Sequence, residues 1–204
     1  MSRLSPNLKH VVGPLGEFLV DGDSENSTEY GWRDMTADLS GRGQGATAPT
    51  WASYRDGLSA QQFAKGDEVS VVFHPNHDII PGTLYYPHIH WSTNSTTSSG
   101  VVVWCIELTQ AEGFDTAAFP ATSTIEMTYT FTANKQYQHF ITECSDAQAF
   151  TMPDVDSLIL MRVYRKNDAA DTFAGNVFGH TVDLHYRSGK LFTKGKRPNF
   201  NEAD

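Results

Sequence analysis

Residues 124–132 constrain the fold more than any other segment of the chain. Their sequence, TIEMTYTFT, alternates apolar residues with threonine or glutamate without a break. A period of two places the apolar side chains on one face of an extended strand and the polar ones on the other. Threonine is also favoured in strands, because its branched β-carbon suits a pleated surface. The pattern therefore predicts a half-buried β-strand over residues 122–132.

The rest of the chain after residue 50 shows the same kind of pattern, punctuated by turn-forming residues. The runs at 69–73, 101–108 and 157–164 are almost continuously apolar, which predicts strands covered on both faces. Only two short segments, 58–64 and 111–114, resemble helices. Further strands are predicted at 50–55, 84–93, 137–144 and 179–186.

This arrangement predicts an all-β fold, an antiparallel β-sandwich of jelly-roll type with an extended polar N-terminal arm. About eight strands separated by frequent turns suit two four-stranded sheets. An immunoglobulin-like sandwich, with fewer strands, is the alternative. We expect three regions: an extended arm with short strands over 1–50, a jelly-roll β-sandwich over 51–189, and a C-terminal tail over 190–204. The arm pieces most similar to strands are 17–20 and 31–38.

The charge and composition exclude several classes of protein. Among the 204 residues, 15 are Lys or Arg and 24 are Asp or Glu, a formal net charge of −9. An acidic chain is poorly suited to binding nucleic acid, which requires a basic face. No apolar run is long enough to span a membrane, and no secretory leader is expected. Cys105 and Cys144 are expected to be buried free thiols in a protein made in a reducing cytosol.

Two histidines give the clearest candidate for site chemistry. His88 and His90 stand two positions apart on a predicted strand, so both side chains leave the same face. The segment from Gly82 to His90, a glycine followed by five residues and His-x-His, matches the opening of the cupin metal motif. The glutamate that this motif has a few residues further on is missing. His180 or His185 could supply a third ligand. The competing interpretation is that these histidines hydrogen-bond within the sheet. We favour it, and expect no catalytic residue, no metal and no cofactor, with His88, His90 and His180 as the metal candidates.

Several segments together resemble a family of small virion-associated proteins of tailed bacteriophages, in the order found there. The resemblance covers residues 30–200. The segments are WRDM (32–35), PTWASYRDG (49–57), EVSVVFH (68–74), YPHIHWS (86–92), VWCIE (103–107), LILMRVYR (158–165), DTFAG (171–175), VDLHY (182–186) and PNF (198–200).

The resemblance implies a non-enzymatic virion structural protein with a jelly-roll-like fold. The expected role is capsid decoration, in which a cement protein binds and stabilises the assembled head. A tail or head-fibre component is the alternative. Expected partners are further copies of the chain, for instance in a trimer, and the major capsid protein or other virion proteins. The implied location is the virion, after synthesis in the bacterial cytoplasm. In this family the Pro-His-x-His-Trp strand has no known metal requirement.

Two other functions remain open. A tail or head-fibre component could bind carbohydrate through exposed aromatic residues, and the candidates are Trp91, Trp104, Tyr85 and Tyr86, although Trp104 lies in an apolar run and is expected in the core. A cupin-like metal-dependent enzyme would instead use His88 and His90.

Overall fold

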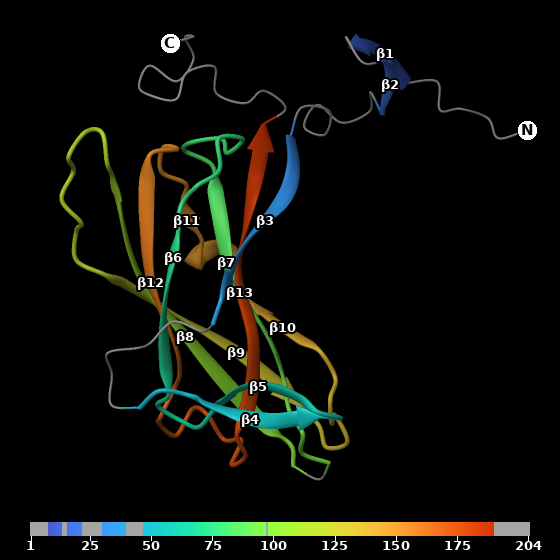
Figure 1. The fold of residues 1–204 in the computed structure, drawn as a ribbon, viewed down its shortest axis with the longest axis vertical. Coiled ribbons are helices and arrows are strands. Elements are labelled where there is room, and N and C mark those ends of the chain that lie inside the picture. The colour runs from blue at the N-terminus through green and yellow to red at the C-terminus, as the bar shows by residue number, and fades with distance from the viewer. Residues whose placement is uncertain (1–7, 14–15, 22–29, 40–46, 97, 190–204) are drawn as a thin grey trace, which may run out of the picture.

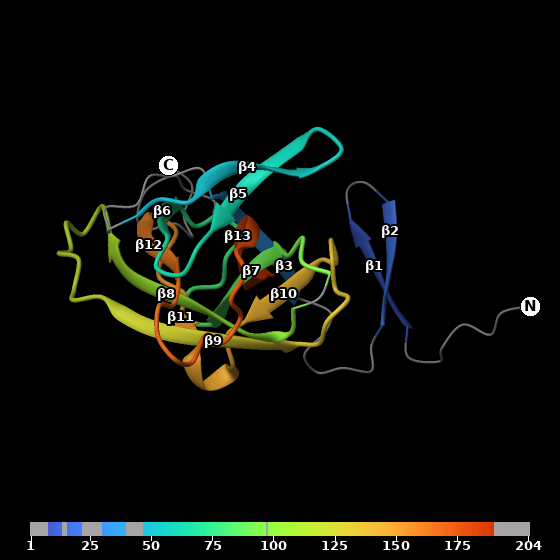
Figure 2. The ribbon, with the colours of Figure 1, turned by 90° about the horizontal axis from the view of Figure 1, so that it is seen from below.

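Two antiparallel sheets packed face to face form the body of the protein (Figures 1 and 2). The computed structural model describes residues 8–13, 16–21, 30–39, 47–96 and 98–189. The larger sheet contains seven strands: β3 (Tyr30–Asp38), β4 (Thr50–Arg55), β5 (Leu58–Phe63), β7 (Leu84–Ser92), β10 (Phe140–Glu143), β11 (Phe150–Thr151) and β13 (Val177–Gly189). The smaller sheet contains four: β6 (Glu68–Phe73), β8 (Gly100–Glu112), β9 (Ser123–Phe131) and β12 (Ser157–Arg165).

The order of the strands is that of a jelly roll. The larger sheet has the order β10-β7-β13-β5-β4, with β3 pairing with β13 and β11 with β7, and the smaller sheet has the order β6-β12-β8-β9. From β5 to β13 the chain passes back and forth between the sheets, and only β8 and β9 are consecutive neighbours in the smaller one. The predicted antiparallel sandwich of jelly-roll type is therefore confirmed.

The core lies between the two sheets and is rich in aromatic side chains. Trp91 of β7 and Trp104 of β8 are both fully buried, with ring centroids 6.4 Å apart. Strand β9 behaves as its alternation predicts: Ile125 and Met127 are buried, while Thr128 is exposed. The two cysteines are buried and free, as predicted.

Some local predictions are wrong. Residues 58–63 form strand β5 in place of the helix expected over 58–64, and β8 continues as a strand to Glu112, where a turn follows. Both segments are short, and pairing with a neighbouring strand outweighs their weak helical preference. Strands β6 and β12 are covered on one face only, since Val72 and Leu160 are exposed on the other. In the part of the chain that the structure describes, no helix is long and apolar enough to cross a membrane.

The two segments of the predicted arm that the sequence indicated as strands are strands in the structure. Residues 17–20 lie within β2 (Gly16–Asp21), which pairs with β1 (Leu8–Gly13). Residues 31–38 lie within β3, which pairs with β13 along nine residues and so belongs to the larger sheet. The predicted C-terminal tail, residues 190–204, lies outside the described residues. The division of the chain into arm, body and tail stays a prediction.

A buried ion pair holds the loop that leads into β13. Arg165, at the end of β12, donates from Nε and Nη2 to the two carboxylate oxygens of Asp171, both at 2.8 Å, and neither side chain is exposed. Its guanidinium also donates to the carbonyl oxygens of Phe173 and Gly175, each at 2.6 Å. Every charge in this cluster therefore has a partner, which buried charges require.

We predict that Asp171→Asn destabilises the protein by about 3–5 kcal/mol, because the substitution leaves the buried guanidinium without a counter-charge. Urea denaturation followed by tryptophan fluorescence measures the change. The control is Asp168→Asn, at an exposed carboxylate in the same loop. Asparagine at position 168 can still accept the hydrogen bond from the backbone N–H of Ala170. The urea midpoint of Asp168→Asn should therefore stay close to that of the wild type. Equal midpoints for all three proteins would contradict the prediction.

Candidate functional site

Strand β7 sends alternate side chains to opposite faces of the larger sheet, and its outward face carries the candidate site. Tyr85, Ile89 and Trp91 point into the core and are fully buried. Tyr86 and His90 point outward and are half-buried, and His88, between them, is covered by its neighbours. The prediction that His88 and His90 share one face is confirmed: their ring centroids are 5.0 Å apart.

Neighbouring strands place carboxylates and a further histidine beside this row. In the strand pairing, His88 lies opposite Asp183 of β13 on one side and Glu143 of β10 on the other. His185, two residues after Asp183, lies opposite Tyr86, and Asp34 of β3 lies opposite His185. Residues directly paired in antiparallel strands share a face, so four strands contribute to one polar surface.

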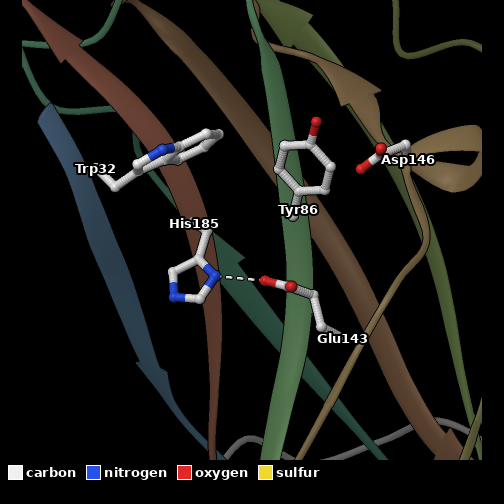
Figure 3. Close-up of a pocket in the computed structure, with 5 residues that line it drawn as sticks. All are labelled: Trp32, Tyr86, Glu143, Asp146 and His185. Atoms are coloured by element: carbon white, nitrogen blue, oxygen red, sulfur yellow. Dashed lines mark hydrogen bonds and ion pairs between the residues drawn. The ribbon is translucent and has the colours of Figure 1, made fainter. Parts of the chain in front are cut away.

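A surface pocket of about 380 Å³ opens over this part of the sheet (Figure 3). Its lining combines two aromatic rings, two carboxylates and one imidazole: Trp32, Tyr86, Glu143, Asp146 and His185. In Figure 3 the two aromatic rings lie on one side of the group and the hydrogen bond from His185 to Glu143 on the other. The ring centroids of Trp32 and Tyr86 are 5.7 Å apart, in an edge-to-face arrangement.

Ionic contacts fix the side chains that line the pocket. His185 donates from Nδ1 to Glu143, and its Nε2 lies 2.8 Å from Oδ1 of Asp34. The guanidinium of Arg187 lies over the ring of Trp32, 5.2 Å from the ring centroid. The pocket side chains are therefore held by one another and by the adjacent Asp34 and Arg187, while more than half of the Trp32 surface, 55%, remains exposed. Exposed aromatic rings beside carboxylates suit a ligand with both apolar faces and hydroxyl groups.

His88 forms the buried layer next to this pocket. Its exposed fraction is only 1%, and its ring packs against that of His185 with centroids 4.0 Å apart. Burial lowers the pKa of His88, and the neighbouring His185 lowers it further. A neutral imidazole at this position has a free ring nitrogen that can accept a hydrogen bond or bind a metal ion.

The structure separates the metal candidates that the sequence suggested. One ligand atom each from His88, His90 and Asp183 lie within 4.8 Å of one another, and a second group joins His88 to Asp34 and His185. His180 belongs to neither group. The register of β13 shifts between Gly179 and Thr181, which leaves His180 without a paired residue on β7.

Three of the four aromatic residues suggested for carbohydrate binding lie elsewhere. Trp91 and Tyr85 are fully buried in the core, so the expectation that they face a ligand is wrong, and Trp104 is buried as expected. Only Tyr86 lines the pocket. The alternation along β7 could have shown this, because a strand that turns His88 outward must turn its odd-numbered residues inward.

The pocket also contains residues that the sequence did not single out. Trp32, Glu143 and Asp146 come from β3, β10 and the short 3₁₀ helix η1 (Asp146–Gln148). Trp32 is separated from Glu143 and Asp146 by more than 100 positions in the sequence, and no spacing rule connects it to them. The one available signal was a tryptophan in the polar N-terminal region, where a core residue is not expected.

Comparisons with known proteins do not identify a family for this chain. No family model matches it, and no curated protein does. Several solved structures, including the following three, share a similar course of the chain at low identity. Dimeric latent PorU from Porphyromonas gingivalis has 10% identity and a TM-score of 0.39. The match covers 82% of this chain and 14% of the PorU chain.

The other two structures are associated with xylan. A xylan-binding module, CBM15, has 13% identity and a TM-score of 0.39, with 76% of this chain covering 97% of that one. Xylanase 10B from Clostridium thermocellum, a CBM22-1–GH10 fragment complexed with xylohexaose, has 8% identity and a TM-score of 0.36, with 81% of this chain covering 28% of that one. Likenesses at this level of identity and TM-score carry no functional argument.

We predict that His180 makes stability depend on pH. Burial lowers its pKa below the ordinary value of 6.5, and His139 and His90 lower it further. The unfolded chain then binds more protons than the folded protein below about pH 6.5, so the free energy of unfolding should fall as the pH falls through this range. His180→Gln should weaken this dependence, measured by urea denaturation between about pH 7.5 and 5.5.

The control for this experiment is His74→Gln, at an exposed histidine outside the sheet face. Its pH dependence should match that of the wild type. Identical slopes for the wild type and His180→Gln would show that the folded protein does not suppress protonation of His180.

Proposed function

We propose that this chain is a non-catalytic binding protein that recognises carbohydrate through the pocket around Trp32 and Tyr86. The observation that carries the proposal is an exposed tryptophan beside a second aromatic ring, with two carboxylates and an imidazole within the same 380 Å³ pocket. Sugar rings offer apolar C–H faces to aromatic side chains and hydroxyl groups to charged acceptors. The pocket supplies both kinds of partner on a rigid sheet surface.

The charge of the pocket indicates the class of sugar. Glu143 and Asp146 line it, and Asp34 contacts His185 at its border. The whole chain carries a formal net charge of −9. Sugars with carboxylates or sulfates would approach against this field, whereas neutral sugars would not. We therefore propose neutral pentose or hexose units as the ligand.

The setting we propose is a bacteriophage virion. The resemblance to virion proteins of tailed phages supports this setting, and a head-fibre or tail component that binds a surface glycan would unite it with the pocket. Copies repeated on a particle strengthen weak binding by avidity, so each pocket needs only modest affinity.

Binding to a glycan array of neutral and acidic oligosaccharides tests the proposal. We predict that Trp32→Ala weakens binding of the best neutral ligand at least tenfold, or about 1.4 kcal/mol, measured by isothermal titration calorimetry. The matched control is Trp51→Ala, which removes another exposed tryptophan, on β4 of the same sheet and outside the pocket. Equal affinities for the two variants, or no glycan bound by the wild type, would refute the proposal.

A second candidate function is favoured by the opposite side of the sandwich. Val72 of β6 and Leu160 of β12 are directly paired and exposed on the outer face of the smaller sheet, where they help to line a groove of about 330 Å³. Two carboxylates on this face, Glu68 and Glu107, both pair with Arg162, and a third, Glu126, pairs with Lys166. A second copy of an acidic chain would meet less repulsion here than at a face with unpaired carboxylates.

We propose that this face joins copies of the chain in a homo-oligomer, the arrangement expected here for a capsid decoration protein. Val72→Lys should then convert the oligomer to monomer, because it places a charge in a desolvated apolar contact. Light scattering after size-exclusion chromatography measures the mass. Leu58→Lys, at an exposed leucine of β5, is the control and should leave the oligomer intact. A monomeric wild type at tens of micromolar would exclude this function.

A further inference from the structure

We propose that His88, His90 and Asp183 form a binding site for one divalent transition-metal ion of the Zn²⁺ class. The ligand atoms are Nε2 of each histidine and Oδ2 of the aspartate. This oxygen lies 3.3 Å from Nε2 of His90 and 3.8 Å from Nε2 of His88. The three residues come from two paired strands, β7 and β13, at the centre of the larger sheet. The proposal does not depend on carbohydrate binding.

The distances between the ligand atoms suit tetrahedral zinc. Zinc binds imidazole nitrogen and carboxylate oxygen at about 2.0–2.2 Å, so two ligands at tetrahedral angles are about 3.4 Å apart. The separation of 3.3 Å between Nε2 of His90 and Oδ2 of Asp183 matches this value, and the 3.8 Å from Nε2 of His88 to the same oxygen is a few tenths of an ångström longer. One ligand atom from each of the three residues lies within 4.8 Å of the other two. Two imidazoles and a carboxylate also suit Zn²⁺ better than Mg²⁺ or Ca²⁺, which prefer oxygen ligands.

One ring nitrogen of this group lacks the polar partner that a buried nitrogen normally has. Nε2 of His90 is buried and has no hydrogen-bond partner, although the carboxylate of Asp183 lies only 3.3 Å away. Buried polar atoms normally have a partner, and one without a partner calls for an explanation. A cation between the imidazole and the carboxylate would satisfy both groups at once.

The remaining polar atoms of the three ligands are already held by neighbours. Nδ1 of His88 lies 3.4 Å from the carbonyl oxygen of Tyr86, and Nδ1 of His90 lies 2.7 Å from Nε2 of His139. Oδ1 of Asp183 accepts a hydrogen bond from Oγ1 of Thr181 at 2.8 Å. Metal-binding histidines usually donate their other ring N–H in this way, which fixes the tautomer and the ring orientation.

The other possible groupings fit less well. Both ring nitrogens of His185 already contact carboxylates, those of Glu143 and Asp34, so this histidine has no free nitrogen to offer. His180 hydrogen-bonds to Ser92 and lies outside both groups. His88 packs against His185, so a metal ion bound to His88 would stabilise the sheet next to the pocket. None of its ligands would be a residue that lines the pocket.

Titration of the full chain with Zn²⁺, after treatment with a chelator and without sugar, tests the proposal. We expect one site per chain in calorimetry. His90→Gln and Asp183→Asn should each weaken binding at least 100-fold. The matched control is His180→Gln, at a histidine on the same strand as Asp183 but outside the group, and its affinity should equal that of the wild type.

A second measurement uses the wild type alone, so that it does not depend on whether a variant folds. In ¹H–¹⁵N spectra of the imidazoles, Zn²⁺ should shift Nε2 of His88 and His90 and leave the resonances of His180 unchanged. No stoichiometric binding, or equal loss of binding in His180→Gln, would overturn the proposal. So would binding that survives His90→Gln and Asp183→Asn. Trp32→Ala should bind Zn²⁺ normally, so failure of the carbohydrate proposal would be seen separately.

Discussion

The two-residue repeat of strand β7 is the constraint on which the rest of the structure depends. One set of its residues, including Ile89 and Trp91, fills the core, and the intervening set, Tyr86, His88 and His90, forms the outer surface. A shift of register by one residue would exchange the two sets and bury three polar rings against the smaller sheet. The packing energy of Trp91 in the core therefore also fixes the direction in which both histidines point. Site geometry and fold stability are linked through a single strand.

A strand can present such a polar surface only if its neighbours supply partners. The residues opposite His88 are Asp183 and Glu143, so carboxylates flank the imidazole on both sides. Each of these carboxylates belongs to a strand whose alternate residues are buried, Leu184 in β13 and Thr142 in β10. The same alternation thus repeats across the sheet and aligns polar side chains into rows. This is why residues distant in sequence gather on one surface.

Much of the fold could be predicted from the sequence, because alternation and turn residues act locally. The strand at 122–132, the jelly-roll class and the shared face of His88 and His90 all follow from a period of two. The members of the site could not be predicted in the same way. Asp183 and Glu143 acquire their roles from strand pairing, which is set by the topology of the whole chain. His180 does not join His88 and His90 as a metal ligand, because the register of β13 shifts locally at this residue, and no pattern in the sequence predicts that shift.

Two polar clusters of the molecule, around Arg165 and around His90, differ in how completely their buried polar atoms are paired. At Arg165 every donor that contacts Asp171, Phe173 or Gly175 has a well-placed acceptor, so the cluster is complete and serves the fold. At His90 one buried nitrogen lacks a hydrogen bond although an acceptor lies nearby, so the cluster is incomplete. A complete network gains nothing from a ligand, whereas an incomplete one gains the missing interaction when a ligand binds. The contrast supports the proposed metal site on the outer face of the larger sheet and a structural role for the ion pair at the end of β12.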